Sequence, residues 1–380
     1  MRALACAAAA ACLLTVPASG SAEDALLSEA VAFSGVTGFL AAGAPAFVIA
    51  AVRDGETAFA GFGETATGNG REPDADTIMR IGSISKVFCG ATLASMVADG
   101  EIALTDRLQD RLGWEGVTLP EKDGRAIRIL DLATQASGLP REVTMTPQPV
   151  DDPFAYNTRA AATADLAANP LLFAPGTGAH YSNFGFDLLG AALAHTGGKP
   201  YAELLRERVL APNGMDDTLF TPRPEDDGRL MQGHNFDGAP MLFAPTPETI
   251  ECAGGLHTTA NDMLKWMRWN LDRFATADAE MRAIDHAAWL YRDGLTVASG
   301  LDEGGAPMDA MGLGWVINMP EGDSPLILQK SGGLQGMFTY MAIAPTRGVA
   351  VFAAINAFSV AGFPAMVHTV TELVTALAPR

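Results

Sequence analysis

Short runs with the composition of β-strands stand at both ends of this chain, and helical periodicity fills the stretch between them. Residues 46–53 and 57–62 are apolar and flank an Asp-Gly turn signal, which predicts a hairpin. Four further strand-like runs follow near the other end, at residues 313–319, 326–330, 338–344 and 349–355, before a helical pattern over 366–377. Strands at both ends predict one antiparallel sheet assembled from both termini, with a helical region inserted into it.

The stretch between the strands carries apolar residues at helical spacing. We expect helices at residues 24–42, 85–99, 129–136, 185–196, 200–211 and 259–272. Residues 140–180 look like loop, and such loops often carry substrate contacts. The chain is therefore predicted to be α+β, with a sheet lobe of about residues 24–82 and 300–380. A helical lobe of about residues 83–299 completes it, with a cleft between the lobes.

The N-terminus has the pattern of a secretory signal. Arg2 precedes an apolar stretch over residues 3–16, and small residues follow up to Ala22. This order indicates a signal peptide over residues 1–22, whose removal leaves one catalytic domain over residues 23–380 in the periplasm. The stretch is too short to cross a membrane, and no later run reaches the roughly 18 uninterrupted apolar residues expected of a span.

The charge of the chain argues against two classes of partner. The formal net charge is −19 at neutral pH. Nucleic acid and anionic membrane surfaces both require stripes of basic side chains on the protein. We therefore expect no nucleic-acid partner and no transmembrane or membrane-surface role, while the oligomeric state stays open.

Two cysteines remain beyond the signal, Cys89 and Cys252. Neither belongs to a Cys-x-x-Cys pair, which argues against redox chemistry. Export would permit a disulfide between them. Because sequence does not show that they meet, two buried free thiols are the expected state.

The first motif with chemical content is Ser83-Ile84-Ser85-Lys86, at the start of a predicted helix. One helical turn separates Ser83 from Lys86, so both side chains can face one cleft. A serine hydroxyl needs a base beside it, and a lysine serves as that base only when burial or nearby cations lower its pKa. The helix start also offers backbone N–H groups to an oxyanion. Taken alone, the motif is better explained as an ordinary helix N-terminus capped by serine.

The second motif is Tyr181-Ser182-Asn183, between a Pro-Gly loop and a helix. A tyrosine held between two lysines would have its pKa lowered, because positive charge favours the phenolate. Tyr181 could then take the Ser83 proton and pass it to a leaving nitrogen. Asn183 offers an amide that can hold substrate or fix Lys86. The alternative is a packed tyrosine followed by a capping asparagine.

The third motif, Lys330-Ser331-Gly332-Gly333, is predicted to end a strand and enter a glycine-rich turn. A strand edge can pair with a peptide-like substrate, and Gly332 and Gly333 let its backbone approach closely. Lys330 would add positive charge facing the tyrosine oxygen and a substrate carboxylate. The alternative is a strand–turn junction with a solvated lysine.

These three motifs in this order resemble the serine β-lactamase and penicillin-binding-protein superfamily, whose signatures are Ser-x-x-Lys, Tyr-x-Asn or Ser-x-Asn, and Lys-Thr/Ser-Gly. The tyrosine of the second motif is typical of the class C β-lactamase and D-alanyl-D-alanine carboxypeptidase branch. Within it the chain is most similar to AmpH-type carboxypeptidase/endopeptidases. The similar segments include Leu139-Pro140-Arg141-Glu142, the run over 181–189 and Gln329-Lys330-Ser331-Gly332-Gly333.

The resemblance implies a β-lactamase/transpeptidase-like fold and a role for each motif residue. Ser83 is the acylated nucleophile, and Lys86 and Tyr181 share the acid/base work. Asn183 and Lys330 bind substrate, together with the Ser331-Gly332 strand end. Backbone N–H groups of Ser83 and Gly333 form the oxyanion hole.

Two positions depart from the pattern. Ser331 stands where many relatives have threonine, which keeps the hydroxyl. His257 follows Gly254-Gly255-Leu256, where relatives often differ, and we expect a local loop histidine. None of the histidines has metal-ligand spacing, so we expect neither a metal nor any other cofactor.

The expected function is a periplasmic D-alanyl-D-alanine carboxypeptidase/endopeptidase that acts on peptidoglycan peptides and binds penicillins. A class C-like β-lactamase shares the acylation step and differs in how fast water clears the acyl-enzyme. An esterase of the same fold would prefer small esters. A non-catalytic peptide-binding protein is the alternative from another class, and it would form no covalent adduct with β-lactams.

Overall fold

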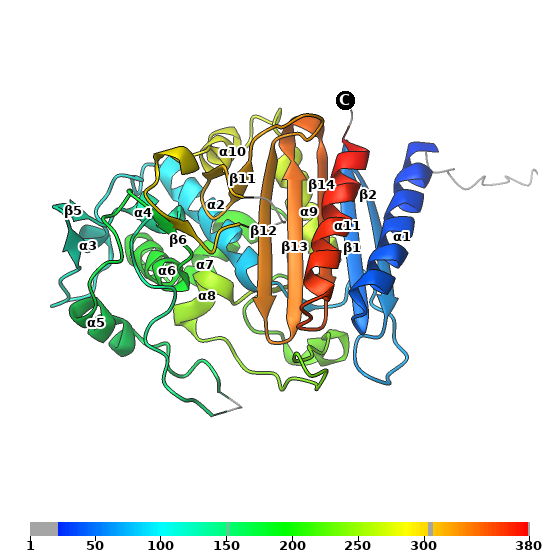
Figure 1. The fold of residues 1–380 in the computed structure, drawn as a ribbon, viewed down its shortest axis with the longest axis horizontal. Coiled ribbons are helices and arrows are strands. Elements are labelled where there is room, and N and C mark those ends of the chain that lie inside the picture. Colours follow the sequence, from blue (N-terminus) through cyan, green and yellow to red (C-terminus); the bar gives the residue numbers. More distant parts are fainter. Residues whose placement is uncertain (1–21, 150–151, 303–306, 379–380) are drawn as a thin grey trace, which may run out of the picture.

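The sheet predicted from both termini is confirmed by a computed structural model, which describes residues 22–149, 152–302 and 307–378 (Figure 1). The eight strands of the main sheet follow the order β2-β1-β14-β13-β12-β11-β10-β8, with antiparallel neighbours throughout. Their bounds are β1 (Ala46–Arg53), β2 (Glu56–Gly63), β8 (Leu290–Tyr291), β10 (Ala310–Met311), β11 (Val316–Asn318), β12 (Ile327–Leu334), β13 (Met337–Ala344) and β14 (Val349–Ile355). β1, from the start of the chain, pairs with β14, from its end.

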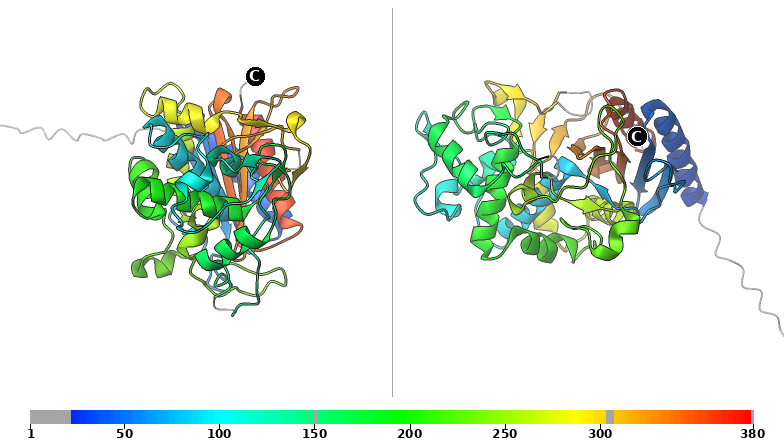
Figure 2. Two further views of the ribbon diagram at one scale, coloured as in Figure 1. Left: turned by 90° about the vertical axis from the view of Figure 1, so that its left-hand side faces the viewer. Right: turned by 90° about the horizontal axis from the view of Figure 1, so that it is seen from below.

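Strand β1 lies between the edge strand β2 and β14, and both of its faces are apolar and buried. Side chains alternate across a strand, so Val48 and Ala50 pack into one core, while Phe47 and Ile49 pack into the core on the opposite face. α1 (Ala22–Ala42) and α11 (Gly362–Leu377) cover the second face. Figure 1 shows both helices in front of the sheet, and Figure 2 shows the layers from two other sides.

The first face carries the inserted helices, which pack against it through α2 and α9. Their bounds are α2 (Ser85–Ala98), α3 (Leu108–Arg111), α4 (Ile129–Ala133), α5 (Arg159–Ala168), α6 (Asn183–Gly197), α7 (Tyr201–Leu205), α8 (Glu251–Gly254), α9 (Ala260–Leu271) and α10 (Ala279–His286). The expectation of loop throughout 140–180 is wrong at α5. Thr158 caps that helix by accepting a hydrogen bond from Ala161 N, and an alanine-rich sequence favours it.

Two short ladders tie the motif-bearing loops together. β3 (Met79–Arg80) pairs with β7 (His257–Thr258) directly before the first motif. β6 (Ala179–His180) pairs in parallel with β9 (Ala298–Ser299) directly before the second. A separate hairpin, β4 (Glu121–Lys122) with β5 (Arg125–Ala126), lies away from the sheet. The ladders fix where the backbone enters Ser83 and Tyr181.

Strand β12 is longer than predicted. The expected turn at Gly332 and Gly333 is wrong, because both glycines pair with β13 and the turn comes at Gln335 and Gly336, which have positive φ. A Cβ on Gly332 would overlap the carbonyl oxygen of Ile81. Glycine is therefore needed here so that the chain leading to Ser83 can pass close to the strand.

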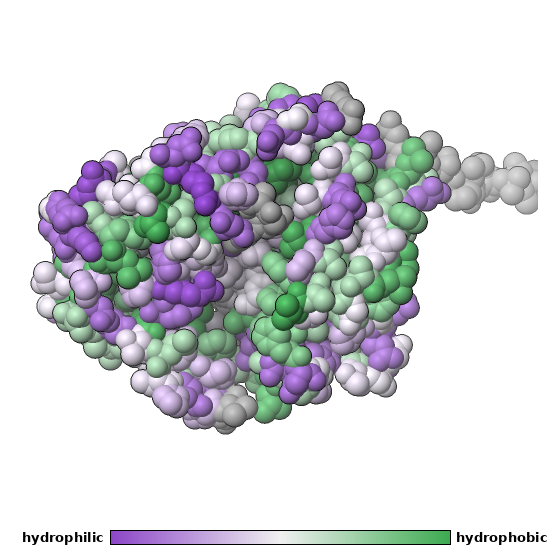
Figure 3. All heavy atoms as spheres, in the orientation of Figure 1, coloured by the Kyte–Doolittle hydropathy of each residue, from purple (hydrophilic) through white to green (hydrophobic). Residues whose placement is uncertain are grey.

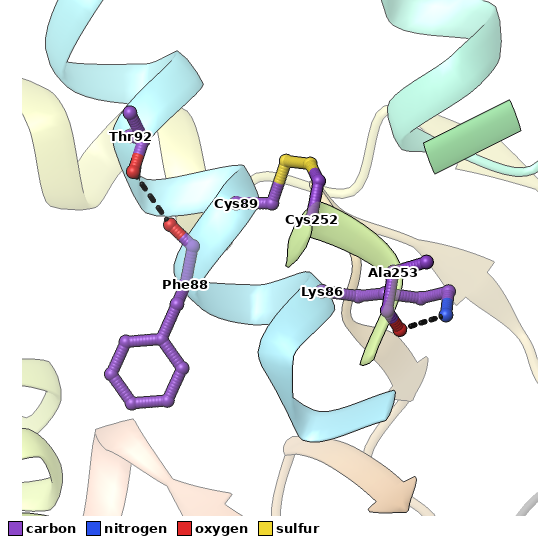
Figure 4. Close-up of a disulfide and its surroundings, with 6 residues drawn as sticks. All are labelled: Lys86, Phe88, Cys89, Thr92, Cys252 and Ala253. Carbon is purple, nitrogen blue, oxygen red and sulfur yellow. Dashed lines mark hydrogen bonds between the residues drawn. A yellow bond between two sulfur atoms is a disulfide. The ribbon is translucent and has the colours of Figure 1, made fainter. Parts of the chain in front are cut away.

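The expectation of two free thiols is also wrong. Cys89 in α2 and Cys252 in α8 form a disulfide with a Cα–Cα distance of 5.4 Å. The two residues are 163 positions apart, so only the packing of α8 against α2 brings them together. Figure 4 shows the bond between the two helices.

Among the described residues, one helical segment, Ala25–Ala42 of α1, is long and apolar enough to cross a membrane by length and composition. In the fold it lies on the sheet, where Leu27 and Val31 are buried. The predicted signal peptide falls mostly on residues 1–21, which lie outside the described part of the chain, so its cleavage stays a prediction.

Candidate active site

Ser83 lies in a single 3₁₀ turn, Gly82–Ile84, that leads into α2. Gly82 has a φ of +50°, and a Cβ there would lie 2.6 Å from the backbone nitrogen of Gly333. A side chain at position 82 would therefore push the turn that carries Ser83 away from β12. The structure brings the first and third motifs together by this backbone contact.

Lys86 follows one helical turn later and is fully buried. Its Nζ lies 3.2 Å from Ser83 Oγ, and it donates to Asn183 Oδ1 at 2.6 Å and to the Ala253 carbonyl at 2.5 Å. Burial lowers the pKa of Lys86, and the positive charge of Lys330 lowers it further, although Tyr181 opposes both. The first motif therefore places a buried amine with a lowered pKa beside the serine hydroxyl.

Tyr181 is buried among three cations. Its ring centroid lies 5.0 Å from Lys86 Nζ, 5.2 Å from Lys330 Nζ and 4.7 Å from Arg141 Cζ. The side chains of Tyr181 and Lys86 are also hydrogen-bonded. The predicted position between two lysines is thus present, and Arg141 adds a third positive charge that the sequence motifs did not predict.

Asn183 is the first residue of α6, and both ends of its amide are engaged. Its Oδ1 accepts from Lys86, and its Nδ2 donates to Glu142 Oε1 at 2.5 Å. Ser182 caps the helix by accepting from Gly185 N, and it also donates to the Pro140 carbonyl. The 140–142 loop therefore orients the amide that holds Lys86, a role the sequence did not reveal.

Asp187, one turn into α6, is a further buried acid beside this cluster. Burial raises the pKa of Asp187 to about 8, despite a hydrogen bond from Asn157 Nδ2 at 2.8 Å. The signal that could have found it is an aspartate four residues after Asn183, on the same helix face and among apolar residues.

Lys330 is buried in β12 and faces the same side of the sheet as Gly332. Among the described residues, the ladder of β11 along β12 ends at Gln329. Residues 331–333 then border a cavity of about 720 Å³ that also reaches Ser83 and Tyr181. The space-filling view shows this face hollowed near its centre (Figure 3).

One end of this cavity is apolar, lined by Phe236, Phe338, Phe358, Phe363 and Val367. The rings contact one another, with Phe338 and Phe358 centroids 4.9 Å apart. The other end is polar and carries the motif residues with Arg141 and Asp302. All three motifs therefore converge on one cavity, with a wall that suits uncharged groups.

His257 does not belong to this cavity. It is buried in β7, stacks on Phe243 at 5.8 Å and lines a smaller cavity with Arg80. Burial, together with the nearby charge of Arg80, lowers the pKa of His257 to about 3, so the ring is neutral. In the described part of the chain, no group of three or more His, Cys, Asp or Glu side chains could hold a metal ion.

Comparison with known proteins identifies the family. The family model described as Beta-lactamase matches residues 24–374. The chain belongs to the beta-lactamase family. A beta-lactamase/D-alanine carboxypeptidase from Yersinia pestis, crystallised with citrate, has a TM-score of 0.84 and 34% identity, covering 93% of this chain and 99% of its own. This structure confirms the β-lactamase/transpeptidase-like fold.

Other members of the family with sequence similarity carry two kinds of name. The D-alanyl-D-alanine-carboxypeptidase/endopeptidase AmpH of Escherichia coli K12 is 34% identical over 347 residues, which is 89% of this chain and 86% of AmpH. A beta-lactamase of Pseudomonas fluorescens is 25% identical over 327 residues, 81% of this chain and 87% of that protein. The higher identity lies with the peptidase.

Proposed function

We propose that this beta-lactamase-family chain is an exported serine hydrolase that cleaves D-alanyl-D-alanine peptides through an acyl-enzyme on Ser83. The observation that carries the proposal is the 3.2 Å approach of Lys86 Nζ to Ser83 Oγ, made by a fully buried lysine. Because burial lowers the pKa of Lys86, more of its amine is neutral near neutral pH. A neutral amine can accept the hydroxyl proton and turn Ser83 into a nucleophile.

Acylation follows from these positions. As Ser83 Oγ bonds to the substrate carbonyl carbon, its proton passes to Lys86 Nζ and the carbonyl electron pair moves onto oxygen. We assign the backbone N–H groups of Ser83 and Gly333 to hold that oxyanion. Collapse of the oxyanion breaks the C–N bond, and the leaving nitrogen takes a proton from the Tyr181 hydroxyl, which Lys86 then reprotonates.

Deacylation runs the same steps with water as the nucleophile. Water loses a proton to the Tyr181–Lys86 pair and attacks the ester carbon. The ester C–O bond then breaks, and Ser83 Oγ recovers the proton. The products are the shortened peptide acid and a free enzyme.

The polar end of the cavity suits a peptide that ends in a carboxylate. Lys330 and Arg141 both flank the Tyr181 ring, and Arg141 lines the cavity. Asn183 holds Lys86, and we propose that it also contacts the substrate amide. Gly332 and Gly333 leave the strand backbone open to close approach. The E. coli relative named as a D-alanyl-D-alanine carboxypeptidase/endopeptidase supports the same substrate class.

Export is the second part of the proposal. The signal-like residues 1–22 support it. The Cys89–Cys252 disulfide supports it independently, because disulfides form and persist in oxidising compartments such as the periplasm.

The test is the intact mass of the protein over time after a penicillin is added, with Ser83→Ala as the control. We expect an adduct that persists for minutes and is absent from the variant. In parallel, release of D-alanine from a peptide ending in D-Ala-D-Ala measures the proposed reaction directly.

Each other outcome points elsewhere. An adduct that clears within seconds, without D-alanine release, identifies a β-lactamase. Rapid cleavage of a chromogenic ester with neither adduct nor D-alanine release identifies an esterase. A folded protein that does none of these is a binding protein, and the proposal fails.

A further inference from the structure

The disulfide joins the nucleophile helix to the backbone group that holds the catalytic lysine. Cys89 lies three residues after Lys86 on α2. Cys252 directly precedes Ala253, whose carbonyl accepts from Lys86 Nζ at 2.5 Å. Figure 4 shows the S–S bond and the Lys86–Ala253 contact beside each other between α2 and α8. Both sulfurs are in buried residues, so the bond is shielded from solvent.

From this arrangement we infer that the Cys89–Cys252 disulfide orients the Lys86 amine, so that its lone pair points toward Ser83. The inference rests on the proposed roles of Ser83 and Lys86. It adds that acylation depends on a covalent bond outside the three motifs, at residues that touch neither substrate nor the reacting atoms.

The geometry of an amine explains why the Ala253 carbonyl matters. A neutral lysine nitrogen has two N–H bonds and one lone pair, arranged tetrahedrally. Asn183 Oδ1 and the Ala253 carbonyl take the two N–H bonds, at 2.6 Å and 2.5 Å. The lone pair is then left for the hydroxyls of Ser83, whose Oγ lies 3.2 Å away, and of Tyr181, which is also hydrogen-bonded to Lys86, so it faces the serine proton that it must remove. If the carbonyl moves, the amine can rotate and the lone pair turns away from Ser83.

Helix α8 cannot hold that carbonyl by its own secondary structure. It has four residues, Glu251–Gly254, which is about one turn and too short to be stable alone. Two ties flank Ala253 instead. The disulfide acts one residue before it, and Leu256 N donates to Ser85 Oγ at 3.1 Å three residues after it.

Cys252 also contacts the helix that supplies the other acceptor. A Cβ on Gly190 of α6 would lie 2.9 Å from the Cys252 Cβ. α6 begins at Asn183, so the cystine lies between the helices that carry Lys86 and Asn183. One covalent bond therefore sets the spacing of both N–H acceptors relative to the lysine.

The experiment compares wild type with the double variant Cys89→Ala/Cys252→Ala. Acylation by a penicillin is followed by rapid mixing and mass, so that the noncovalent dissociation constant and the acylation rate constant are obtained separately. We expect the rate constant to fall about tenfold or more, since small misplacements of catalytic groups cost that much. We expect the dissociation constant to stay within about twofold, because the disulfide does not line the cavity.

Leu27→Ala is the matched control for lost stability. Leu27 is buried on the opposite face of the sheet, so its truncation lowers the melting temperature without touching α8. Both proteins are assayed well below their melting temperatures. The inference predicts that the control acylates at the wild-type rate.

The outcomes separate the inference from the proposed function. If wild type forms no adduct, the proposed function fails. If wild type is acylated and the double variant keeps its rate constant, or the control loses as much, the disulfide only stabilises the fold and the inference is overturned. Should the double variant not fold, wild type is titrated with a reductant. Free thiols and a falling acylation rate must then appear together, and thiols that appear without a change in rate overturn the inference.

Discussion

The two faces of the central sheet are packed from different kinds of residue. Against α1 and α11 the buried side chains of the helices are apolar, such as Leu27, Val370 and Leu373. On the other face, buried ionisable side chains such as Lys86 and Asp285 lie among the apolar residues. A buried charge costs free energy unless it is paired or neutralised. The comparison suggests that one face supplies stability, while the other gives up some stability to hold reactive groups.

Lys86→Met is the change with the largest expected effect. Removing the base should lower the acylation rate at least about 10³-fold, equivalent to about 4 kcal/mol of barrier. The apolar side chain removes the cost of burying the amine but leaves the Asn183 and Ala253 oxygens without their donor, so the melting temperature should change little. Adduct formation and thermal unfolding measure the two effects. A variant that lost stability in proportion to activity would contradict the division between the faces.

Leu373→Ala on α11 tests the other face. Leu373 is buried against the sheet, so truncation should lower the free energy of unfolding by about 2–4 kcal/mol through the cavity left behind. The acylation rate constant should stay within about twofold of wild type. Urea unfolding and adduct kinetics check both values, and a large loss of acylation in the folded variant would mean that the two faces are coupled.

The pH dependence of stability sharpens the comparison. Burial raises the pKa of Asp285 to about 8, whereas an unfolded aspartate titrates near pH 4. Between these values the folded chain keeps a proton that the unfolded chain has lost. The stability from this group is therefore complete below about pH 4 and falls as pH rises toward about 8.

Asp285→Asn should abolish that loss, because an amide does not ionise. Over the two pH units from about pH 5 to pH 7 the loss amounts to about 2.7 kcal/mol, at about 1.4 kcal/mol per unit. Trp315 Nε1, which donates to Asp285 Oδ2 at 2.9 Å, keeps an oxygen acceptor in the variant. Burial also lowers the pKa of His286 to about 4, so this histidine contributes to the pH dependence of both proteins. Subtracting the unfolding free energies of the variant from those of wild type at each pH removes that shared contribution. Equal pH slopes in urea unfolding would show that Asp285 is ionised in the folded state.

The smallest effect is expected at Glu372 on the outer side of α11. Its carboxylate lies 3.1 Å from His368 Nε2, with both side chains about 70% exposed. Exposed pairs contribute little, so Glu372→Ala should change the free energy of unfolding by less than about 0.5 kcal/mol. The same urea measurement checks it, and a loss above about 1 kcal/mol would show that this helix has a polar contribution to stability.

The sequence predicted the sheet well because its signal is local. The apolar runs of β1 and β14 and the Asp54-Gly55 turn can be read without knowing their neighbours. The three motifs likewise identified Ser83, Lys86 and Tyr181, because each motif places chemistry at a fixed short spacing. The structure brings all three motifs to one cavity, and the catalytic roles of their residues remain proposals.

What the sequence missed depends on distance or on packing. The pairing of Cys89 with Cys252 joins residues 163 apart, and no local pattern encodes it. Glu142 orients Asn183 only because a loop folds back onto α6. The extension of β12 through Gly333 was hidden because glycine usually favours turns, whereas here it makes room for the Ile81 carbonyl. Tertiary contacts override local preference at each of these positions.

The pairing of β1 with β14 has a consequence for how the enzyme is made. Phe47 near the start of the chain lies opposite Ile355 near its end, so the sheet cannot close until almost the whole chain has been synthesised. Contacts this distant in sequence form slowly. The N-terminal hairpin must wait with its inner face and its β14 edge uncovered, and the β12–β13 hairpin that borders Ser83 is itself made only late in synthesis. A chain that stops short of β14 is therefore expected to lack the assembled active site.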